Sequence, residues 1–266
     1  VNAQQQKTIH LWPGSVPGET AAKHAAQVAA DGSRDVKRLT DVTDPVLEVF
    51  PAPANNNKGI GVIICPGGGY SILAINLEGY EIASWLNKLG YTAFVLQYRV
   101  PKKEAGVVQD AQRAIRIVRS RAAEWGLRPE KIGMMGFSAG GSLTARASTE
   151  YKANTYTAID KADALSARPD FGVLVYPAYL DRGENKTLTP ELKVDAKTPP
   201  MFLFATADDQ YSNSALVMAG ALRDAKVPVE QHLYPKGGHG YGLRSGNPAG
   251  ETWPSLLEKW LKTTVK

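Results

Sequence analysis

Residues 131–144 read KIGMMGFSAGGSLT, and this stretch of the 266-residue sequence decides the fold. The apolar run that ends at Phe137 predicts a buried strand, and the small and aliphatic residues from Gly140 onward predict a helix. Between the two lies the pattern G-x-S-x-G, with Ser138 at its centre. A strand, a tight turn and a helix are the context in which this pattern holds a nucleophilic serine above a sheet. We therefore predict that Ser138 is a catalytic nucleophile.

Steric crowding at such a turn explains the glycines on either side of the serine. The serine has a strained backbone, and side chains at Gly136 and Gly140 would collide with the neighbouring strand and helix. The helix that begins here also directs its free N–H groups and the positive end of its dipole toward the reacting centre. We accordingly expect the N–H of Ala139 to be one donor to a developing oxyanion.

Strands and helices alternate along the rest of the chain. Nearly continuous apolar runs, typical of strands buried on both faces of a parallel sheet, predict strands at Ile60–Cys65, Tyr91–Tyr98, Lys131–Gly136, Phe171–Tyr176, Met201–Ala205 and Val229–Tyr234. Helices are predicted at Leu77–Leu89, Val107–Trp125, Gly140–Tyr151, Ser212–Asp224 and Thr252–Leu261. This alternation predicts an α/β protein of the α/β-hydrolase fold, with a doubly wound, mostly parallel sheet flanked by helices.

The domain organisation predicted is a single α/β-hydrolase domain of residues 1–266. Residues 46–266 form the catalytic core, and residues 1–45 form an N-terminal arm without a strong secondary-structure element. Val46–Phe50 is expected to add an antiparallel strand at the edge of the sheet. The segment from Pro177 to Pro200 is polar and rich in charge, so we expect a loop with one short turn and no large cap domain.

A second glycine-rich motif, PGGGY at residues 66–70, follows the first core strand. Three consecutive glycines cost folding entropy, so they need a reason. No Lys-Ser/Thr follows, which excludes a phosphate-binding P-loop, and the G-x-G-x-x-G spacing of a dinucleotide site is absent. A plain turn and a loop of oxyanion donors remain. We assign the N–H groups of Gly68 and Gly69 to an oxyanion hole together with that of Ala139.

The same fold places its acid and its base after the nucleophile, on loops at the carboxyl ends of strands. Of the four histidines, only His239 meets this condition, in the glycine-rich PKGGHGYG. The acid is expected after the strand Met201–Ala205, where Asp208 and Asp209 stand side by side. One of them would orient the imidazole, and the residues alone leave the choice open.

Composition argues against several other classes of protein. The net charge is +5, but the basic residues do not gather into a patch with interleaved aromatics, so no nucleic-acid partner is expected. The single cysteine, Cys65, permits no intramolecular disulfide and no cysteine-based zinc site, and the histidines lack ligand spacing. We expect no metal and no cofactor.

The longest apolar stretch, Gly61–Cys65, is too short to cross a membrane. The polar start VNAQQQK suits a secreted or periplasmic chain whose signal peptide has been removed.

A series of segments in one order resembles the acetylxylan-esterase-like branch of the α/β-hydrolases, which is related to hormone-sensitive-lipase-type esterases and includes some feruloyl esterases. The segments are LWPGSVPGE, CPGGGYSILA, EGYEIASWLNKLGYTAFVLQYRVP, DAQRAIRIVRSRAAEWGLRPEKIGMMGFSAGG, PPMFLFATADDQ and GGHGYGLR. The resemblance implies that Asp209 is the acid. It also implies a serine carboxylesterase that removes short acyl groups, chiefly acetyl, from xylan or xylo-oligosaccharides. Ser142, where members often have histidine, and the residues 211–213 depart from the family pattern.

Four tyrosines fall on or beside the predicted catalytic loops: Tyr70, Tyr179, Tyr211 and Tyr241. Tyrosines at an open rim offer flat apolar faces and hydroxyls, which suit sugar rings, although any one of them is as well explained by packing. The alternatives are a feruloyl or general carboxylesterase, a peptidase or lactone hydrolase of the same fold, and an inactive carbohydrate-binding homologue. The expected substrate is a small-molecule or polysaccharide ester.

Overall fold

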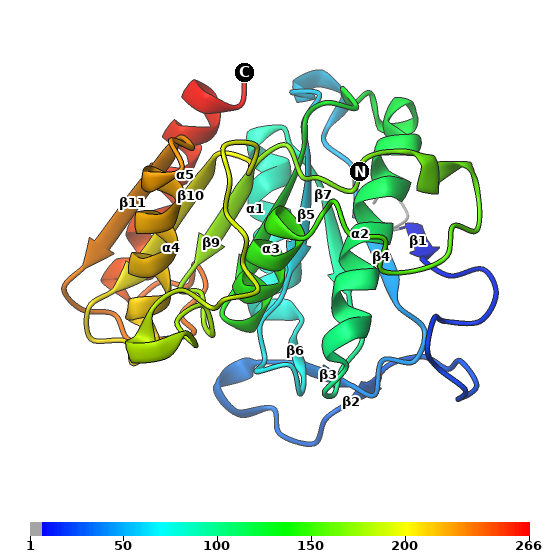
Figure 1. Ribbon diagram of the computed structural model, residues 1–266, viewed down its shortest axis with the longest axis horizontal. Coiled ribbons are helices and arrows are strands. Elements are labelled where there is room, and N and C mark those ends of the chain that lie inside the picture. The colour runs from blue at the N-terminus through cyan, green and yellow to red at the C-terminus, as the bar shows by residue number, and fades with distance from the viewer. Residues whose placement is uncertain (1–6) are drawn as a thin grey trace.

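Eight strands form the central sheet of the computed structural model, which describes residues 7–266 (Figure 1). Their order across the sheet is β1-β4-β7-β5-β8-β9-β10-β11. The strands are β1 (Lys7–His10), β4 (Val46–Phe50), β5 (Gly61–Cys65), β7 (Thr92–Gln97), β8 (Ile132–Phe137), β9 (Gly172–Val175), β10 (Met201–Thr206) and β11 (Val229–Tyr234). From β7 to β11 every pairing is parallel. Strand β4 is antiparallel to both of its neighbours, β1 and β7. The predicted mostly parallel, doubly wound sheet is confirmed.

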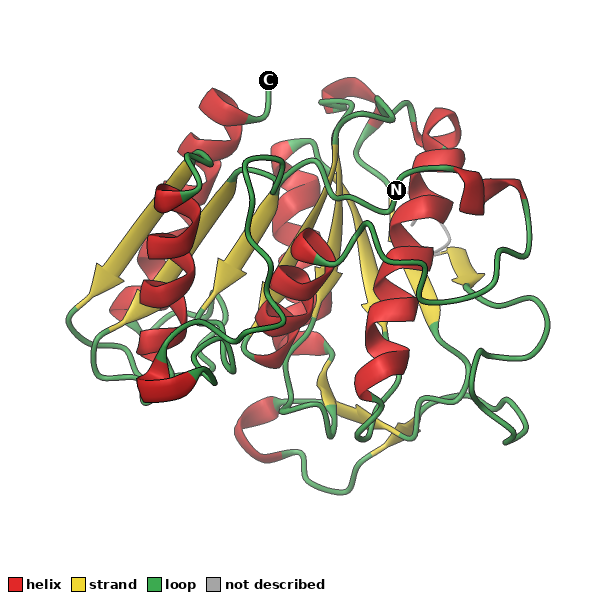
Figure 2. Ribbon diagram, viewed as in Figure 1, coloured by secondary structure: helices red, strands yellow, loops and turns green. Residues whose placement is uncertain are grey.

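Helices cover both faces of this sheet (Figure 2). They are α1 (Glu81–Leu89), α2 (Glu104–Ser120), α3 (Ala139–Thr149), α4 (Ser212–Asp224) and α5 (Pro248–Thr264). Helices α2, α3 and α4 lie on the face toward the viewer in Figure 1, and α1 and α5 lie behind the sheet. The rear pair is joined by Trp85 and Trp253, whose ring centroids are 5.5 Å apart. The five predicted helices are therefore present, and each buries an apolar stripe against the strands.

Several helix boundaries differ from prediction, and three of the differences change the local structure. The expected helix Val107–Trp125 is interrupted after Ser120, and a separate 3₁₀ turn follows at Ala122–Trp125. Helix α5 begins earlier than expected because the Asn247 side chain caps it and a proline occupies its first turn. The expected start of α1 is a π turn, η3 (Asn76–Tyr80), which runs directly into the helix.

The N-terminal arm contradicts two expectations. Strand β1 pairs with β4 on one side while β7 pairs with it on the other, so Val46–Phe50 is not at the edge of the sheet. A second, three-stranded sheet joins β2 (Gln27–Val28), β3 (Arg38–Thr40) and β6 (Leu73–Ala74), and Figure 1 shows it at the end toward which the core strands point. The arm was expected to lack elements because its strands are too short to show a periodic pattern. In β1 only Ile9 is buried.

The segment between Pro177 and Pro200 carries no apolar cap. Its only helical turn is η6 (Glu184–Lys186), as the sequence predicts. Among residues 7–266, no helix is both long enough and apolar enough to cross a membrane. The expectation of an exported chain depends on the polar start of the sequence; residues 1–6 lie outside the described range, and that expectation stays a prediction.

Candidate active site

Ser138 occupies the sharp turn between β8 and α3, and its backbone is strained. Its φ is 53° and its ψ is −118°, a left-handed conformation that side chains other than glycine rarely adopt. Such a conformation costs on the order of 1–3 kcal/mol and persists only where the surrounding structure enforces it. Here β8 lies between β5 and β9, so the turn is fixed from both sides. The strain lifts the serine side chain clear of the sheet.

The packing of the two flanking glycines explains why no other residue fits. A Cβ on Gly136 would lie 1.9 Å from the carbonyl oxygen of Gly140. A Cβ on Gly140 would lie 1.9 Å from the carbonyl oxygen of Cys65 in β5. Both distances are far inside van der Waals contact, so helix α3 reaches this depth in the sheet only because both positions lack side chains. The collisions predicted from the sequence are confirmed.

His239 lies between the serine and a carboxylate. Its Nε2 is 2.7 Å from Oγ of Ser138, and its Nδ1 is 2.6 Å from Oδ2 of Asp209. The Asp209 side chain is 1% exposed and that of His239 is 27% exposed, so the acid is shielded while the imidazole meets the cleft. The other three histidines pair with acids elsewhere, and the structure brings only His239 to the serine.

The neighbouring acid, Asp208, has a different role in the structure. Its carboxylate accepts hydrogen bonds from the N–H groups of Gly238 at 2.9 Å and Gly237 at 3.3 Å. These two bonds, that from Gly238 above all, hold the pKa of the exposed Asp208 below its usual value. Asp208 thus shapes the loop that carries His239, whereas Asp209 contacts the imidazole itself.

The glycine loop after β5 lies against the serine turn, since a Cβ on Gly67 would be 2.9 Å from Cβ of Ser138. No acceptor among residues 7–266 meets the N–H of Gly68, of Gly69 or of Ala139. Gly68 has a φ of 141°, and a Cβ there would lie 2.0 Å from the carbonyl oxygen of Ile72, so only glycine fits. Free backbone donors at a helix N-terminus and on an adjoining loop can stabilise negative charge on a substrate oxygen.

Three of the four predicted tyrosines form a continuous aromatic wall that leads to the histidine. The rings of Tyr70 and Tyr179 stack with centroids 6.1 Å apart, and Tyr179 meets Tyr211 edge to face at 5.7 Å. Tyr211 in turn lies 4.9 Å from the ring of His239. Tyr70 and Tyr179 have positive φ angles, of 59° and 65°, so the chain holds both rings in place at a cost in backbone energy.

The expectation that Tyr241 lies at an open rim is wrong. The residue is only 7% exposed, and its ring packs edge to face on Tyr176 at 4.6 Å. Burial is the main reason that the pKa of its hydroxyl lies far above the usual value. The glycines on either side have φ angles of 72° and 57°, which turn the chain so that this side chain points into the core.

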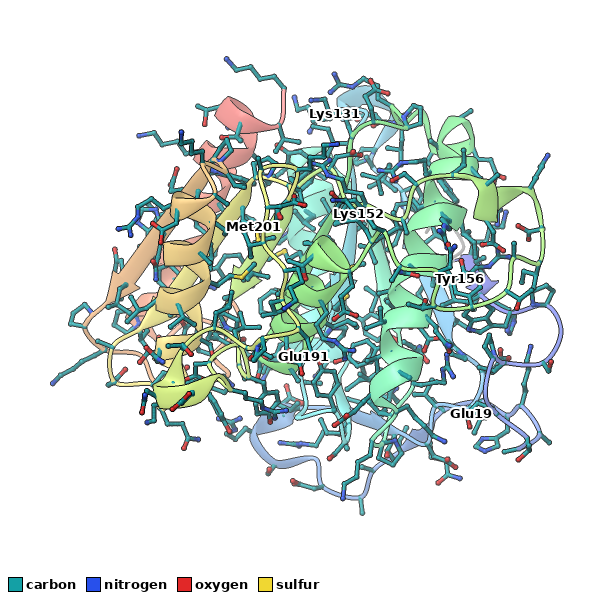
Figure 3. The ribbon with its side chains drawn as sticks, in the orientation of Figure 1. Glu19, Lys131, Lys152, Tyr156, Glu191 and Met201 are labelled. Carbon is teal, nitrogen blue, oxygen red and sulfur yellow. The ribbon has the colours of Figure 1, made fainter. Side chains whose placement is uncertain are left out.

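A cavity of about 830 Å³ adjoins the site and meets it at Gly69. Its wall combines Tyr70 and Tyr179 with charged and hydroxyl-bearing side chains, which include Ser142, Arg146, Arg182 and Thr189. The guanidinium of Arg182 lies over the Tyr179 ring, 4.4 Å from its centroid. Glu191 also lines the cavity and lies in the lower half of the molecule in Figure 3. A cavity that combines aromatic faces with charged and hydroxyl groups suits the ring and hydroxyls of a sugar.

Sequence reasoning missed two buried residues behind the site, Glu78 and Tyr176. The Glu78 carboxylate accepts a hydrogen bond from the N–H of Gly67 at 2.7 Å and another from the Tyr176 hydroxyl at 2.8 Å. Burial raises the pKa of Glu78, although both hydrogen bonds oppose that effect. A glutamate within a predicted helix normally faces solvent, so the sequence carries no signal of its burial.

The N-terminal arm also reaches the site. A guanidinium nitrogen of Arg34 lies 3.8 Å from where a Cβ on Gly240 would be, beside the histidine. Arg244 holds this part of the arm: it donates to the carbonyl oxygens of Arg34 and Asp35 at 2.9 and 2.8 Å and pairs with Glu81 at 2.7 Å. This part of the arm therefore lies beside the loop that carries His239.

Known proteins are similar to this chain in sequence and in fold. The sequence profile of the BD-FAE family matches residues 47–175. An acetylxylan esterase of Xylanibacter ruminicola is 31% identical over 234 residues, which cover 78% of this chain and 46% of that protein, so the chain spans less than half of that relative.

Two solved structures are similar over nearly the whole chain. The crystal structure of an acetyl ester-xyloside bifunctional hydrolase from Caldicellulosiruptor lactoaceticus has a TM-score of 0.78 and 32% identity, and the match covers 96% of this chain and 95% of that one. The α/β-hydrolase MGS-M1, from a Medee basin deep-sea metagenome library, has a TM-score of 0.67 and 29% identity, covering 90% and 98%. Its sequence, its serine turn and these relatives show that this chain belongs to the α/β-hydrolase esterases.

Proposed function

We propose that this chain is a serine carboxylesterase that removes acetyl groups from xylan or xylo-oligosaccharides through an acyl-enzyme. The observation that carries the proposal is the alignment of Ser138, His239 and Asp209, with 2.7 and 2.6 Å between successive polar atoms. These are hydrogen-bond distances between a nucleophile, a base and an orienting acid, which is the arrangement that activates a serine hydroxyl.

Acylation begins when Oγ of Ser138 attacks the ester carbonyl carbon and its proton passes to Nε2 of His239. The carboxylate of Asp209 holds the imidazole in the required tautomer and stabilises the imidazolium that forms. The carbonyl oxygen becomes an oxyanion, which accepts hydrogen bonds from the N–H groups of Gly68, Gly69 and Ala139. When the intermediate collapses, the sugar hydroxyl departs with the proton from His239 and leaves acetyl-Ser138.

Deacylation repeats these steps with water as the nucleophile. His239 takes a proton from the water molecule as the water attacks the acetyl carbonyl carbon, and the same N–H groups stabilise the second oxyanion. Collapse returns the proton from His239 to Oγ of Ser138 and releases acetate. The base is a side chain and the oxyanion is stabilised by backbone donors, so residues of this chain supply the proton transfer and the charge stabilisation in both steps.

The choice of substrate rests on the relatives and on the cavity. The similar proteins are named for acetylxylan and for acetyl ester-xyloside hydrolysis. The cavity beside Gly69 joins tyrosine rings to charged and hydroxyl side chains, an environment in which sugar rings stack and form hydrogen bonds. We assign Tyr70, Tyr179 and Tyr211 to the binding of the carbohydrate portion.

Acetate release from acetylated xylan tests the proposal. The wild-type chain should release acetate and hydrolyse p-nitrophenyl acetate, and the Ser138→Ala variant should do neither. Labelling by a fluorophosphonate should require Ser138, which separates an active esterase from an inactive carbohydrate-binding homologue. Hydrolysis of p-nitrophenyl acetate without acetate release from the polymer would refute the substrate while leaving the chemistry in place. Release of ferulate from feruloylated xylan, with no release of acetate, would support the feruloyl esterase alternative.

A further inference from the structure

A chain of hydrogen bonds runs behind the reacting groups and joins the two catalytic loops. The N–H of Gly67 donates to Oε2 of Glu78 at 2.7 Å, and the hydroxyl of Tyr176 donates to Oε1 at 2.8 Å. The Tyr176 hydroxyl also accepts from the N–H of Gly242 at 3.0 Å. Gly67 immediately precedes the proposed oxyanion glycines, and Gly242 lies three residues after His239. One carboxylate and one hydroxyl therefore connect the two loops.

Local backbone geometry places both side chains for this contact. Glu78 belongs to the π turn η3, in which the N–H of Tyr80 donates to the carbonyl oxygen of Ile75 at 2.9 Å. Single π turns are rare and occur frequently at functional sites. Tyr176 directly follows β9 and has a φ of 37°, a strained conformation for a residue with a side chain. Two uncommon backbone conformations thus bring the two side chains together.

The position of the Glu78 carboxylate relates it directly to the nucleophile. A Cβ built on Gly67 would lie 2.7 Å from Oε2 of Glu78 and 2.9 Å from Cβ of Ser138, so the carboxylate and the serine flank the same glycine. Glu78 is 3% exposed and has no cation in salt-bridge contact within residues 7–266, although Arg34 and His239 act on it from longer range. A buried carboxylate without a cationic partner is costly, and proteins retain few of them outside functional sites.

We propose that Glu78 is a positioning residue of the esterase site, which holds the oxyanion loop and the histidine loop in register through Tyr176. The inference rests on the proposed function, because the two loops matter only if Ser138 is acylated. Both carboxylate oxygens accept hydrogen bonds, so the ionised form fits the geometry. The Glu78 carboxylate also lies near enough to His239 for the charges of the two side chains to interact.

Several groups besides Glu78 surround the imidazole, and the substitutions below remove none of these contacts, since Tyr176→Phe keeps the aromatic ring. Asp209 contacts Nδ1, Ser138 contacts Nε2, and the rings of Tyr176 and Tyr211 pack on the imidazole at 5.0 and 4.9 Å. From the arm, Arg34 lies beside Gly240, and its positive charge acts to lower the pKa of Glu78. Of the groups named here, Glu78 is the buried carboxylate that also contacts the oxyanion loop, through the N–H of Gly67.

Two substitutions separate the geometric contribution of Glu78 from its charge. Glu78→Gln keeps the shape and an acceptor for Gly67, but it removes the charge and replaces the acceptor for Tyr176 with a donor. Tyr176→Phe removes the link to Gly242 and leaves the charge. Because small displacements of catalytic groups can cost about 100-fold in rate, we expect either variant to lose about 10- to 100-fold in kcat on p-nitrophenyl acetate, with KM within about twofold.

The pH profile supplies a readout that a merely structural role would not change. Removing a negative charge near His239 disfavours the imidazolium, so the acid limb of kcat/KM should move to lower pH in Glu78→Gln. It should move little in Tyr176→Phe, in which the carboxylate remains. Turnover in both variants within twofold of wild type, or an acid limb that stays in place in Glu78→Gln, would overturn the proposal.

A matched control is available at Tyr156, whose hydroxyl donates to the Asp163 carboxylate at 2.6 Å beside α2 and away from the cavity (Figure 3). Tyr156→Phe removes the same kind of tyrosine–carboxylate bond and should leave kcat unchanged. A loss of kcat in this control equal to that in Tyr176→Phe would also overturn the proposal. If Glu78→Gln does not fold, the comparison of the two tyrosine variants decides. An inactive wild-type chain would instead refute the proposed function.

Discussion

Nδ1 of His239 lies 2.6 Å from Oδ2 of Asp209, while the adjacent Asp208 carboxylate faces the N–H groups of Gly237 and Gly238. Two consecutive aspartates therefore point to different parts of the same loop. Asp209 is buried against the imidazole, whereas Asp208 is exposed and holds the backbone of the loop that carries His239. The sequence alone left both open, and the family resemblance favoured the one that the structure places against the histidine.

This division predicts unequal effects of matched substitutions. Asp209→Asn should lower kcat by about 10³- to 10⁴-fold, because an amide cannot hold the imidazole in the tautomer that accepts the serine proton. Asp208→Asn should cost less than about tenfold, since the side-chain oxygen can still accept from a glycine N–H. Steady-state kinetics on p-nitrophenyl acetate compare the two. The reverse order of losses would assign the acid to Asp208.

Replacement of the nucleophile should separate chemistry from folding. In Ser138→Ala we expect kcat to fall by about 10⁴-fold or more, because the acyl-enzyme can no longer form. Alanine is smaller than serine, and the hydrogen bond that Oγ forms within residues 7–266 is the one with His239, so the melting temperature measured by circular dichroism should stay close to that of wild type. Near-wild-type turnover in this variant would contradict the mechanism.

The shape of the site predicts a preference among esters. The highest kcat/KM is expected on acetyl esters and should fall steeply beyond butyrate, because the segment from Pro177 to Pro200 supplies no apolar cap for a long chain. A p-nitrophenyl ester series measures this. A preference for octanoyl or longer esters would be the contrary result.

The aromatic wall leads to a separate prediction about the carbohydrate portion. Tyr179→Ala should raise KM for acetylated xylo-oligosaccharides several-fold, since one stacked ring is worth on the order of 1 kcal/mol. The same substitution should leave kcat/KM on p-nitrophenyl acetate nearly unchanged, because that ester has no sugar to stack. Equal losses on both substrates would indicate a structural role for the ring.

Stability should depend on pH through a buried ion pair far from the site. Burial alone would raise the pKa of Asp163, but the N–H of Ile159, the Tyr156 hydroxyl and the Arg113 guanidinium together hold that pKa below its usual value. A lowered pKa in the folded state means that the stabilisation is present above the unfolded pKa, about 3.9, and is lost as pH falls through the folded pKa.

Asp163→Asn should therefore cost about 1.5–3 kcal/mol of unfolding free energy at neutral pH, and the difference from wild type should shrink below about pH 4. Urea unfolding at several pH values measures both quantities. A difference that stays constant down to the acid range would show that the charge of Asp163 contributes nothing.

Elements with strong local patterns could be predicted from the sequence. The core strands are apolar along their whole length because both of their faces are covered. The glycine and serine spacing G-x-S-x-G at residues 136–140, between a strand and a helix, is typical of few other structures. Strand β1 could not be predicted, since four residues with one buried side chain show no period. Its partner β4 consequently seemed to lie at the edge.

The parts of the site that escaped prediction depend on contacts between distant segments. Glu78 and Tyr176 are 98 residues apart in the sequence, and neither has a local signature of its burial. Tyr241 seemed exposed because glycine-rich loops are usually at the surface, but the positive φ angles around it turn the ring inward. Such residues are determined by tertiary packing, which a single sequence does not display.

The crowding around Ser138 has a consequence for protein engineering. Any side chain at Gly136 or Gly140 would clash with a backbone carbonyl oxygen, and one at Gly141 would clash with Pro177. Libraries randomised at these positions should therefore contain few folded members. The loop that carries Tyr179 and Arg182 borders the cavity and is exposed over much of its length, while its second residue, Ala178, donates to the carbonyl oxygen of Ser138. Changes in the length and composition of this loop should therefore alter which alcohol portions of the ester are accepted, while the catalytic groups stay the same.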